Sequence, residues 1–253
     1  MSRGSATLTV AATCSLALAA CGGDNDDQGS GQLVVSAASS LQDAFTDYAA
    51  TAGIDAKQSF AGSDQLAAQI RQGAKPDVFA AANTTLPDEL HKDGLVEKPV
   101  VFATNSLVLA VPAGSGITSV EDLTRPGTTI AIGDPDVPVG AYTREVLDRL
   151  PADQGKEILA GVRSEEPDVL GIVGKLTEGA VDAGFVYISD VAASDGALRA
   201  IELPAALQPD VAYGAAVVVG AVNPDGARKF IEGLLDGDGA SALKQAGFKA
   251  PPG

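Results

Sequence analysis

Two serine residues mark the point where an apolar extended run passes into a helix. The run 33–38 ends at Ser39 and Ser40, and apolar side chains from Leu41 onward recur at the spacing of one helical face. We therefore predict a strand, a turn with Ser39 and Ser40 at the N-cap position, and a helix that ends near Ala52. The free backbone N–H groups and partial positive charge of a helix start can bind an anion. An ordinary capped helix is the alternative interpretation of one such segment.

Further segments repeat this arrangement along the chain. Each segment places small or hydroxyl-bearing residues at the end of an apolar run or at the start of a helix. The four segments are residues 59–64, 133–140, 168–169 and 183–190. The last of them puts the Tyr187 hydroxyl at the end of a strand. Because open α/β sheets bind ligands outside the carboxyl ends of their strands, we expect these groups to converge. Donors without Lys or Arg are typical of a site for a small, fully ionised oxyanion.

In this order, the five segments resemble the successive motifs of the molybdate-binding proteins that serve ABC importers, over nearly all of residues 32–249. The resemblance implies an α/β, two-lobed periplasmic binding protein fold of type II. Each lobe would be a mixed sheet flanked by helices, with the oxyanion in the cleft between them. The resemblance implies five binding residues: Ser40, Ser63, Val139, Val169 and Tyr187. Val139 and Val169 would act through their backbone N–H groups. It implies molybdate or tungstate as the ligand, bound through its oxygens, with no cofactor and no catalytic residue.

Two positions depart from this family pattern. Gly62 stands where many relatives have another serine, and Val139 stands where a smaller alanine is common. A backbone N–H donor remains at both positions, so both can still bind an anion. The changed side chains leave open which oxyanion the site prefers. A pocket made only of donors rejects hydrogen phosphate, whose proton would find no acceptor. Sulfate is smaller than molybdate and would make longer, weaker bonds, and it stays the alternative ligand.

Short apolar runs alternate with helical segments along the rest of the chain. This alternation predicts layered α/β architecture with parallel strand pairing. The pattern restarts after the Pro- and Gly-containing break at 112–116. We therefore predict two lobes, the first formed by residues 32–106 and 212–253 and the second by residues 107–211.

The N-terminal residues predict export and a lipid anchor. Residues 1–20 have the positive start and the short apolar stretch of a signal peptide, and Leu18–Cys21 resembles the lipobox of bacterial lipoproteins. Cys21 would then carry the lipid, and polar residues 21–31 would form a flexible tether to the outer face of the cell membrane. Cys14 leaves with the leader, so the mature chain can form no disulfide.

Composition excludes several classes of function. The net charge is −16, and loss of Arg3 with the leader makes the mature chain one unit more negative, which argues against nucleic-acid binding. His91 is the only histidine, so the common zinc sites and Ser-His triads are excluded, and Ser40 and Ser63 lack a histidine base. We expect a monomeric binding protein, not an enzyme, that delivers its ion to an ABC permease and the ATPase of that permease.

Overall fold

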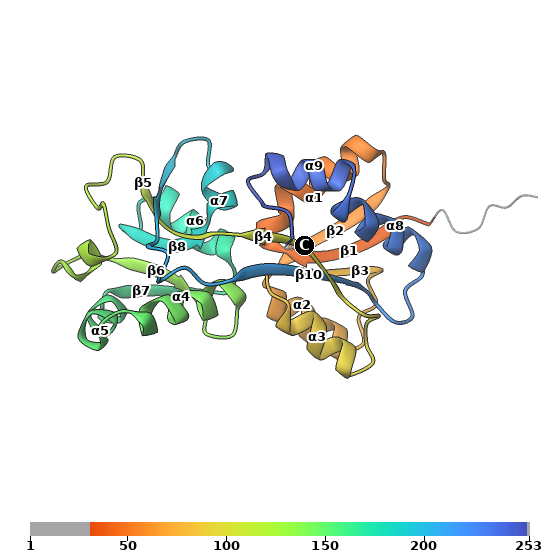
Figure 1. Cartoon of the computed structure of the whole chain (residues 1–253), viewed down its shortest axis with the longest axis horizontal. Helices are drawn as coiled ribbons and strands as arrows, with labels where there is room; N and C mark the ends of the chain where they lie inside the picture. The colour runs from red at the N-terminus through yellow and green to blue at the C-terminus, as the bar shows by residue number, and fades with distance from the viewer. Residues whose placement is uncertain (1–30, 252–253) are drawn as a thin grey trace, which may run out of the picture.

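The computed structural model describes residues 31–251. Within them, two five-stranded sheets flanked by helices form two lobes side by side (Figure 1). The strand orders are β2-β1-β3-β10-β4 in the first lobe and β7-β6-β8-β5-β9 in the second. The fold class predicted from the sequence is therefore confirmed. The predicted signal peptide, the lipidation site at Cys21 and nearly all of the tether lie outside the described residues.

The first lobe combines the N-terminal part of the chain with its C-terminal part. Strand β1 runs parallel to β2 and β3, whereas β10 runs antiparallel to β3 and β4. The strands are β1 (Leu33–Ala38), β2 (Ala56–Ala61), β3 (Val78–Ala81), β4 (Val100–Asn105) and β10 (Val211–Val217). The helices are the short 3-10 helix η1 (Ser39–Leu41), α1 (Gln42–Ala52), α2 (Ser63–Arg71), α3 (Thr85–Lys92), α8 (Pro224–Leu235) and α9 (Asp238–Gln245).

The second lobe is built from the middle of the chain. Strand β6 runs parallel to β7 and β8, and β5 runs antiparallel to β8 and β9. The strands are β5 (Leu107–Pro112), β6 (Ile130–Gly133), β7 (Val162–Glu166), β8 (Ala183–Tyr187) and β9 (Leu198–Glu202). The helices are the 3-10 helix η2 (Glu121–Thr124), α4 (Pro138–Arg149), α5 (Ala152–Ala160), α6 (Val169–Thr177) and α7 (Ile188–Ala192).

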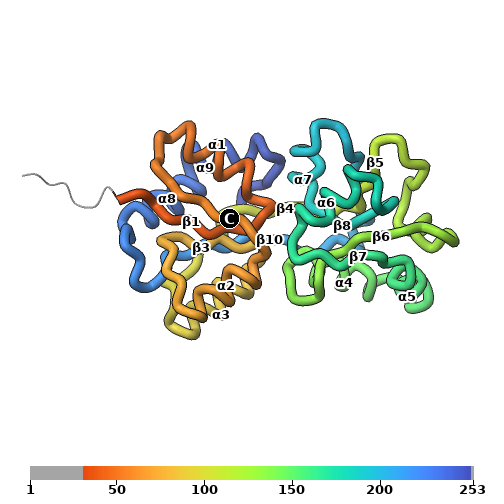
Figure 2. The backbone as a smooth tube through the Cα atoms, turned by 180° about the vertical axis from the view of Figure 1, so that it is seen from behind, coloured from red at the N-terminus to blue at the C-terminus, as the bar shows by residue number. Residues whose placement is uncertain are grey.

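The chain crosses between the two sheets twice. It leaves the first sheet after Asn105, enters the second at Leu107, and returns between the end of β9 and Val211. Seen from behind, β4 and β10 lie together at the junction of the lobes (Figure 2). Strands β5 and β10, which carry the chain from one lobe to the other, run antiparallel to their neighbours, so each sheet is mixed, as predicted. The extent of each lobe stays a prediction.

The hydrophobic core shows why some elements could be predicted and others could not. The inner strands β3, β6 and β8 are fully buried, and such strands read as continuous apolar runs. The edge strands β7 and β9 carry charged residues at exposed or partly exposed positions, and neither strand was predicted from the sequence. Strand β4 and helix α5 were not predicted either. No helix within residues 31–251 has the length and apolar character required to cross a membrane.

Candidate anion-binding site

A small cavity of about 20 Å³ lies between the two lobes. This volume is little more than one water molecule needs, so in this arrangement of the lobes the cavity is too small for an organic ligand. Its lining includes no Lys or Arg and contains every predicted binding residue: Ser40, Ser63, Val139, Val169 and Tyr187. The structure thus brings together five residues that come from five separate elements. That they bind the ligand stays a prediction.

Ser40 lies in the 3-10 helix that joins β1 to α1. The prediction that Ser39 and Ser40 occupy the N-cap position was wrong, because the helical turn already begins at Ser39 and Ala38 is its N-cap. No side chain caps this turn. The Ser40 hydroxyl is therefore not used by its own backbone and instead hydrogen-bonds the Tyr213 hydroxyl at 3.0 Å.

Ser63 is the first residue of α2 and is almost completely buried. Its Oγ accepts a hydrogen bond from the backbone N–H of Ala82 at 3.1 Å. A hydroxyl has one hydrogen to donate, and this contact uses only its acceptor capacity. The Ser63 hydrogen is therefore free to donate to an anion in the cavity.

Val139 is the second residue of α4. Pro138 occupies the first position of this helix, where its fixed φ suits the helix and its missing N–H is not needed. The loop before it turns tightly, since a Cβ placed on Gly140 would lie 1.9 Å from the carbonyl oxygen of Asp134. The N–H groups of the first helical turn have no partner within the helix. Local sequence thus directs a backbone donor at the cavity.

Val169 is the first residue of α6, as predicted. Asp168 is its N-cap, and the Asp168 carboxylate accepts a hydrogen bond from the N–H of Gly171 at 3.1 Å. This cap satisfies the third N–H of the helix and leaves the N–H of Val169 without an intrahelical partner. The second lobe therefore presents two helix starts to one cavity.

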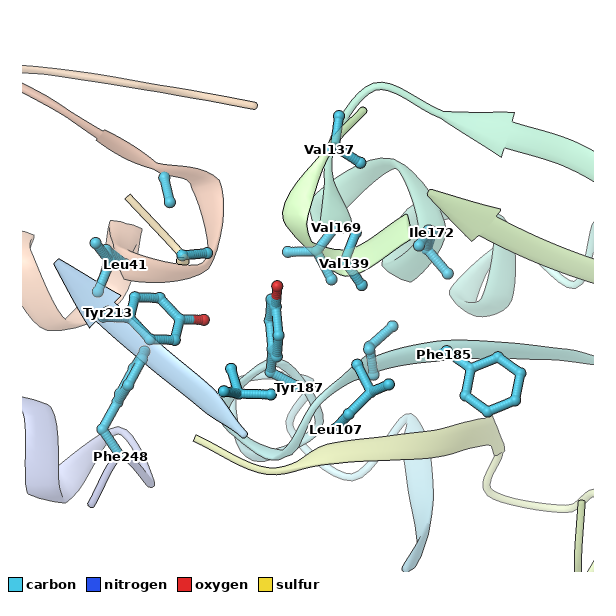
Figure 3. Close-up of a cluster of buried hydrophobic side chains, with 14 of the residues drawn as sticks. Leu41, Leu107, Val137, Val139, Val169, Ile172, Phe185, Tyr187, Tyr213 and Phe248 are labelled. Atoms are coloured by element: carbon cyan, nitrogen blue, oxygen red, sulfur yellow. The ribbon is translucent and has the colours of Figure 1, made fainter. Parts of the chain in front are cut away.

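Tyr187 ends β8, and its hydroxyl is buried without a hydrogen-bond partner among the described residues. Figure 3 shows this hydroxyl pointing toward the side of the cavity formed by Val139 and Val169. Desolvation by burial raises the pKa of Tyr187 well above 10, and Tyr213 and Asp190 act in the same direction. The phenol stays protonated and can act as a donor. A buried donor without a partner is costly, which points to a ligand that completes it.

Asp190 supports Tyr187 from within the second lobe. Its Oδ2 accepts a hydrogen bond from the Tyr187 backbone N–H at 2.8 Å. Desolvation raises the pKa of Asp190 to about 8, against the lowering effect of this N–H, and Asp43 and Asp168 raise it further. Asp190 is therefore mostly uncharged at neutral pH, so it does not oppose an anion nearby.

The two lobes are in close contact at Gly62. A Cβ on this residue would lie 2.4 Å from the carbonyl oxygen of Pro167, which belongs to the second lobe. No Cβ is tolerated at that distance, so the serine of many relatives could not occupy position 62 in this arrangement. Gly62, which stands where many relatives have serine, thus lies at a contact between the lobes.

Tyr213, the hydrogen-bond partner of Ser40, was not predicted from the sequence. It lies in β10 and is completely buried. It was hidden in the longest apolar stretch of the sequence, and its only signal was a hydroxyl-bearing side chain within that stretch. His91, by contrast, lies exposed on α3, as expected.

A small cavity between two lobes of a single chain, with serine and tyrosine side chains and two helix starts in its lining, is typical of a solute-binding protein of the two-lobed kind. The sequence profile described as bacterial extracellular solute-binding protein matches residues 33–249. The chain belongs to this family.

Relatives within the family bear out the resemblance drawn from the motifs. The molybdate-binding protein ModA of Mycobacterium tuberculosis (strain H37Rv) is 36% identical, with 98% of each chain covered. The molybdate-binding protein ModA of Escherichia coli (strain K12) is 32% identical and covers 95% of this chain and 97% of its own.

A solved structure shares the fold. The Azotobacter vinelandii periplasmic molybdate-binding protein superposes with a TM-score of 0.78 at 21% identity, covering 87% of this chain and all of its own. The Mycobacterium tuberculosis sulfate-binding protein SubI superposes with a TM-score of 0.76 at 16% identity, covering 86% of each chain. At these identities the two structures show the fold alone.

Proposed function

We propose that this protein captures molybdate, and tungstate with it, and delivers the ion to an ABC transporter. The observation that carries the proposal is the buried Tyr187 hydroxyl without a partner among the described residues, in a small cavity that Ser40, Ser63, Val139 and Val169 also line. Relatives that bear the name molybdate-binding protein support molybdate as the ion. The ligand would be held through its oxygens by Ser40, Ser63, Val139, Val169 and Tyr187.

Selectivity would follow from the five groups proposed to bind the ion, which all act toward it as donors. Asp168 also lines the cavity, and one oxygen of this carboxylate caps α6. The proton of hydrogen phosphate would find no acceptor among the five groups, and an unmade buried hydrogen bond costs roughly 1–3 kcal/mol. Sulfate carries the same charge as molybdate but is smaller, so its bonds to the same donors would be longer and weaker. Tungstate is nearly the size of molybdate and would bind alike.

The proposal assigns binding and release and no chemical step. The open lobes would capture the ion, closure would complete the donor set from both sides, and the closed form would dock on the permease that its ATPase drives. Cleavage before Cys21 and lipidation there would hold the monomeric protein at the outer face of the cell membrane. Mass spectrometry of the purified protein tests this anchor, because an unmodified Cys21 would exclude it.

The test of the ligand is a calorimetric titration of the full-length protein, purified in mild detergent and freed of bound anion. Molybdate, tungstate, sulfate and phosphate are added in separate titrations. We expect tight binding of the first two only. Tight sulfate binding with weak molybdate binding would assign the same site to a different ion, and no binding at all would refute the proposed function.

Tyr187→Phe tests the observation that carries the proposal. The variant keeps the ring but removes the hydroxyl, and a hydrogen bond to a charged group contributes about 1.5–3 kcal/mol. We expect molybdate affinity to fall roughly 10- to 150-fold. Loss of this unpaired buried donor should not destabilise the ligand-free protein, which thermal unfolding measures. Unchanged affinity would remove Tyr187 from the site.

A further inference from the structure

Tyr213 lies beside the cavity without lining it. Its ring is held on three sides by aromatic edges, with centroid distances of 6.2 Å to Phe102, 5.2 Å to Phe248 and 5.8 Å to Tyr187. The ring planes of Tyr213 and Tyr187 meet at 67°. Figure 3 shows the Tyr213 hydroxyl directed toward Tyr187. Such packing fixes the ring and therefore the place of its hydroxyl.

The hydrogen-bonding needs of the two hydroxyls indicate which one is the donor in the contact between Tyr213 and Ser40. The two hydroxyls lie 3.0 Å apart, and geometry alone allows either to donate. If Ser40 donated, the completely buried Tyr213 hydroxyl would need a second acceptor for its own hydrogen. If Tyr213 donates, its hydrogen is satisfied, and the hydrogen of the partly exposed Ser40 is free to point into the cavity. The second arrangement pairs the buried hydrogen of Tyr213.

The position of Tyr213 also depends on how the lobes meet. Tyr213 belongs to β10 of the first lobe, whereas the Tyr187 ring that it contacts belongs to β8 of the second. Val211, two residues before Tyr213, pairs with Asn105 at the end of β4. The Asn105 amide donates to the Ser189 hydroxyl in the second lobe at 2.9 Å. Both strands at this junction are therefore tied to the lobe that carries Tyr187.

We infer that Tyr213 is a positioning residue for anion binding, which rests on the proposed function and deepens it. Tyr213 donates its hydrogen to Ser40, so that the hydrogen of Ser40 is free to be donated to the ligand. Its ring also packs against Tyr187 and holds that second donor when the lobes are closed. Tyr213 thus orients one donor from each lobe while touching the ligand with neither its ring nor its hydroxyl.

A double-mutant cycle on molybdate affinity tests this role. The proteins compared are the wild type, Tyr213→Phe, Ser40→Ala and the double variant, all full-length. A net hydrogen-bond contribution predicts that Tyr213→Phe weakens binding roughly 2- to 12-fold in the wild type. In the Ser40→Ala background the same change should alter affinity less than about twofold, because the two side chains act through one contact.

The matched control is Tyr48→Phe. Tyr48 is also buried in the first lobe, and its hydroxyl donates to the Phe230 carbonyl at 3.3 Å, away from the cavity. We expect this change to lower the melting temperature without changing molybdate affinity. A second readout is selectivity, since Tyr213→Phe removes the donor that occupies the Ser40 oxygen, and this added acceptor capacity should raise the affinity for hydrogen phosphate relative to molybdate. Tyr48→Phe should leave that ratio unchanged.

The outcomes separate this inference from the proposed function. Failure of the wild type to bind molybdate refutes the proposed function and the inference with it. If the wild type binds, equal losses from Tyr213→Phe with and without Ser40 overturn the positioning role, as does an unchanged affinity. A Tyr213→Phe variant too unstable to titrate would also overturn the positioning role, because the Tyr213 hydroxyl would then be needed for folding. The Phe ring keeps the aromatic packing, and Tyr48→Phe shows what loss of a buried tyrosine hydroxyl alone does to stability.

Discussion

The two lobes present chemically different donors to the same cavity. The first lobe contributes two side-chain hydroxyls, those of Ser40 and Ser63, whereas the second contributes the starts of α4 and α6 and the hydroxyl of Tyr187. One substitution removes a hydroxyl, but a backbone N–H survives every substitution except proline. In the proposed site, binding by the first lobe therefore depends on residue identity. Binding by the second depends mainly on where its helices begin.

The largest expected effect comes from Ser63→Ala in the first lobe. The change removes one donor to a charged ligand, and we expect molybdate affinity to fall roughly 10- to 150-fold. It also takes the acceptor from the buried N–H of Ala82, which should cost about 1–3 kcal/mol of stability. Calorimetry measures the first effect and denaturant unfolding the second.

Ser241→Ala is the matched control for Ser63→Ala. Its hydroxyl lies on α9 and donates to the Gly237 carbonyl at 2.9 Å, outside the cavity. We expect unchanged affinity and a stability change within about 0.5 kcal/mol. If Ser63→Ala resembled this control in affinity, the first lobe would not bind through its hydroxyls.

Gly62→Ala tests the contact at which the two kinds of lobe meet. The added methyl would overlap the Pro167 carbonyl, and overpacking of this kind costs about 1–3 kcal/mol. Because the overlap exists only when the lobes are in contact, we expect affinity to fall roughly 5- to 150-fold. The loss should appear mainly as faster dissociation in stopped-flow measurements, with little change in association.

Gly174→Ala is the control for Gly62→Ala. This glycine lies within α6, and nothing stands within 4 Å of the position of a Cβ. Alanine should stabilise the helix by roughly 0.5–1 kcal/mol and leave binding unchanged. Equal affinity of Gly62→Ala and the wild type would mean that the lobes accommodate the methyl without separating.

The pH dependence of binding should come from the second lobe, because the hydroxyls of the first do not titrate. Asp190 has a pKa of about 8, raised first by desolvation. Above pH 8 its negative charge, held next to Tyr187, opposes the bound dianion. We expect molybdate affinity to fall above that pH, by at most about tenfold per pH unit for one linked proton. Asp190→Asn should abolish this fall, and a fall that persists would place its origin elsewhere.

The same group predicts a pH dependence of stability. The folded-state pKa of Asp190, about 8, lies above the value of 3.8 for an unperturbed aspartate. The folded protein therefore keeps a proton that the unfolded chain releases, and the resulting stabilisation is lost as pH rises from about 3.8 to 8. Thermal unfolding should show a decline over this range in the wild type that is weaker in Asp190→Asn. An identical pH profile would contradict the raised pKa.

The difference between the lobes also explains which parts of the site could be predicted from the sequence. Each helix start in the second lobe is marked by its own neighbours, by Pro138 for α4 and by Asp168 for α6, so local chemistry located it. The contact of Ser40 with Tyr213 joins residues 173 positions apart, and no local pattern reports it. For the same reason the sequence shows at Gly62 only the loss of a serine hydroxyl, whereas the contact of Gly62 with Pro167 is visible only in the structure.

Strand prediction failed where burial was incomplete. The inner strands β6 and β8 are buried on both faces and stand out as apolar runs, whereas β7 alternates Arg163 and Glu165 with less exposed residues. Such a strand owes its conformation to pairing with β6 and not to its own composition. Three of the five predicted binding residues, Ser40, Val139 and Tyr187, follow or end the inner strands β1, β6 and β8. Ser63 and Val169 follow the edge strands β2 and β7, and they were located from the starts of their helices.

The smallest effect on affinity is expected for Val139→Ala, which tests whether the second lobe binds through its backbone and not through its side chains. Val139→Ala changes the side chain that departs from the family pattern but keeps the backbone N–H at the second position of α4. We expect calorimetry to give a molybdate affinity within about threefold of the wild type. Val139 is buried, so stability should fall by about 1–3 kcal/mol even though binding does not. A tenfold change in affinity, or in the preference for molybdate over sulfate, would mean that the side chain shapes the cavity, and the second lobe would then depend on residue identity as the first does.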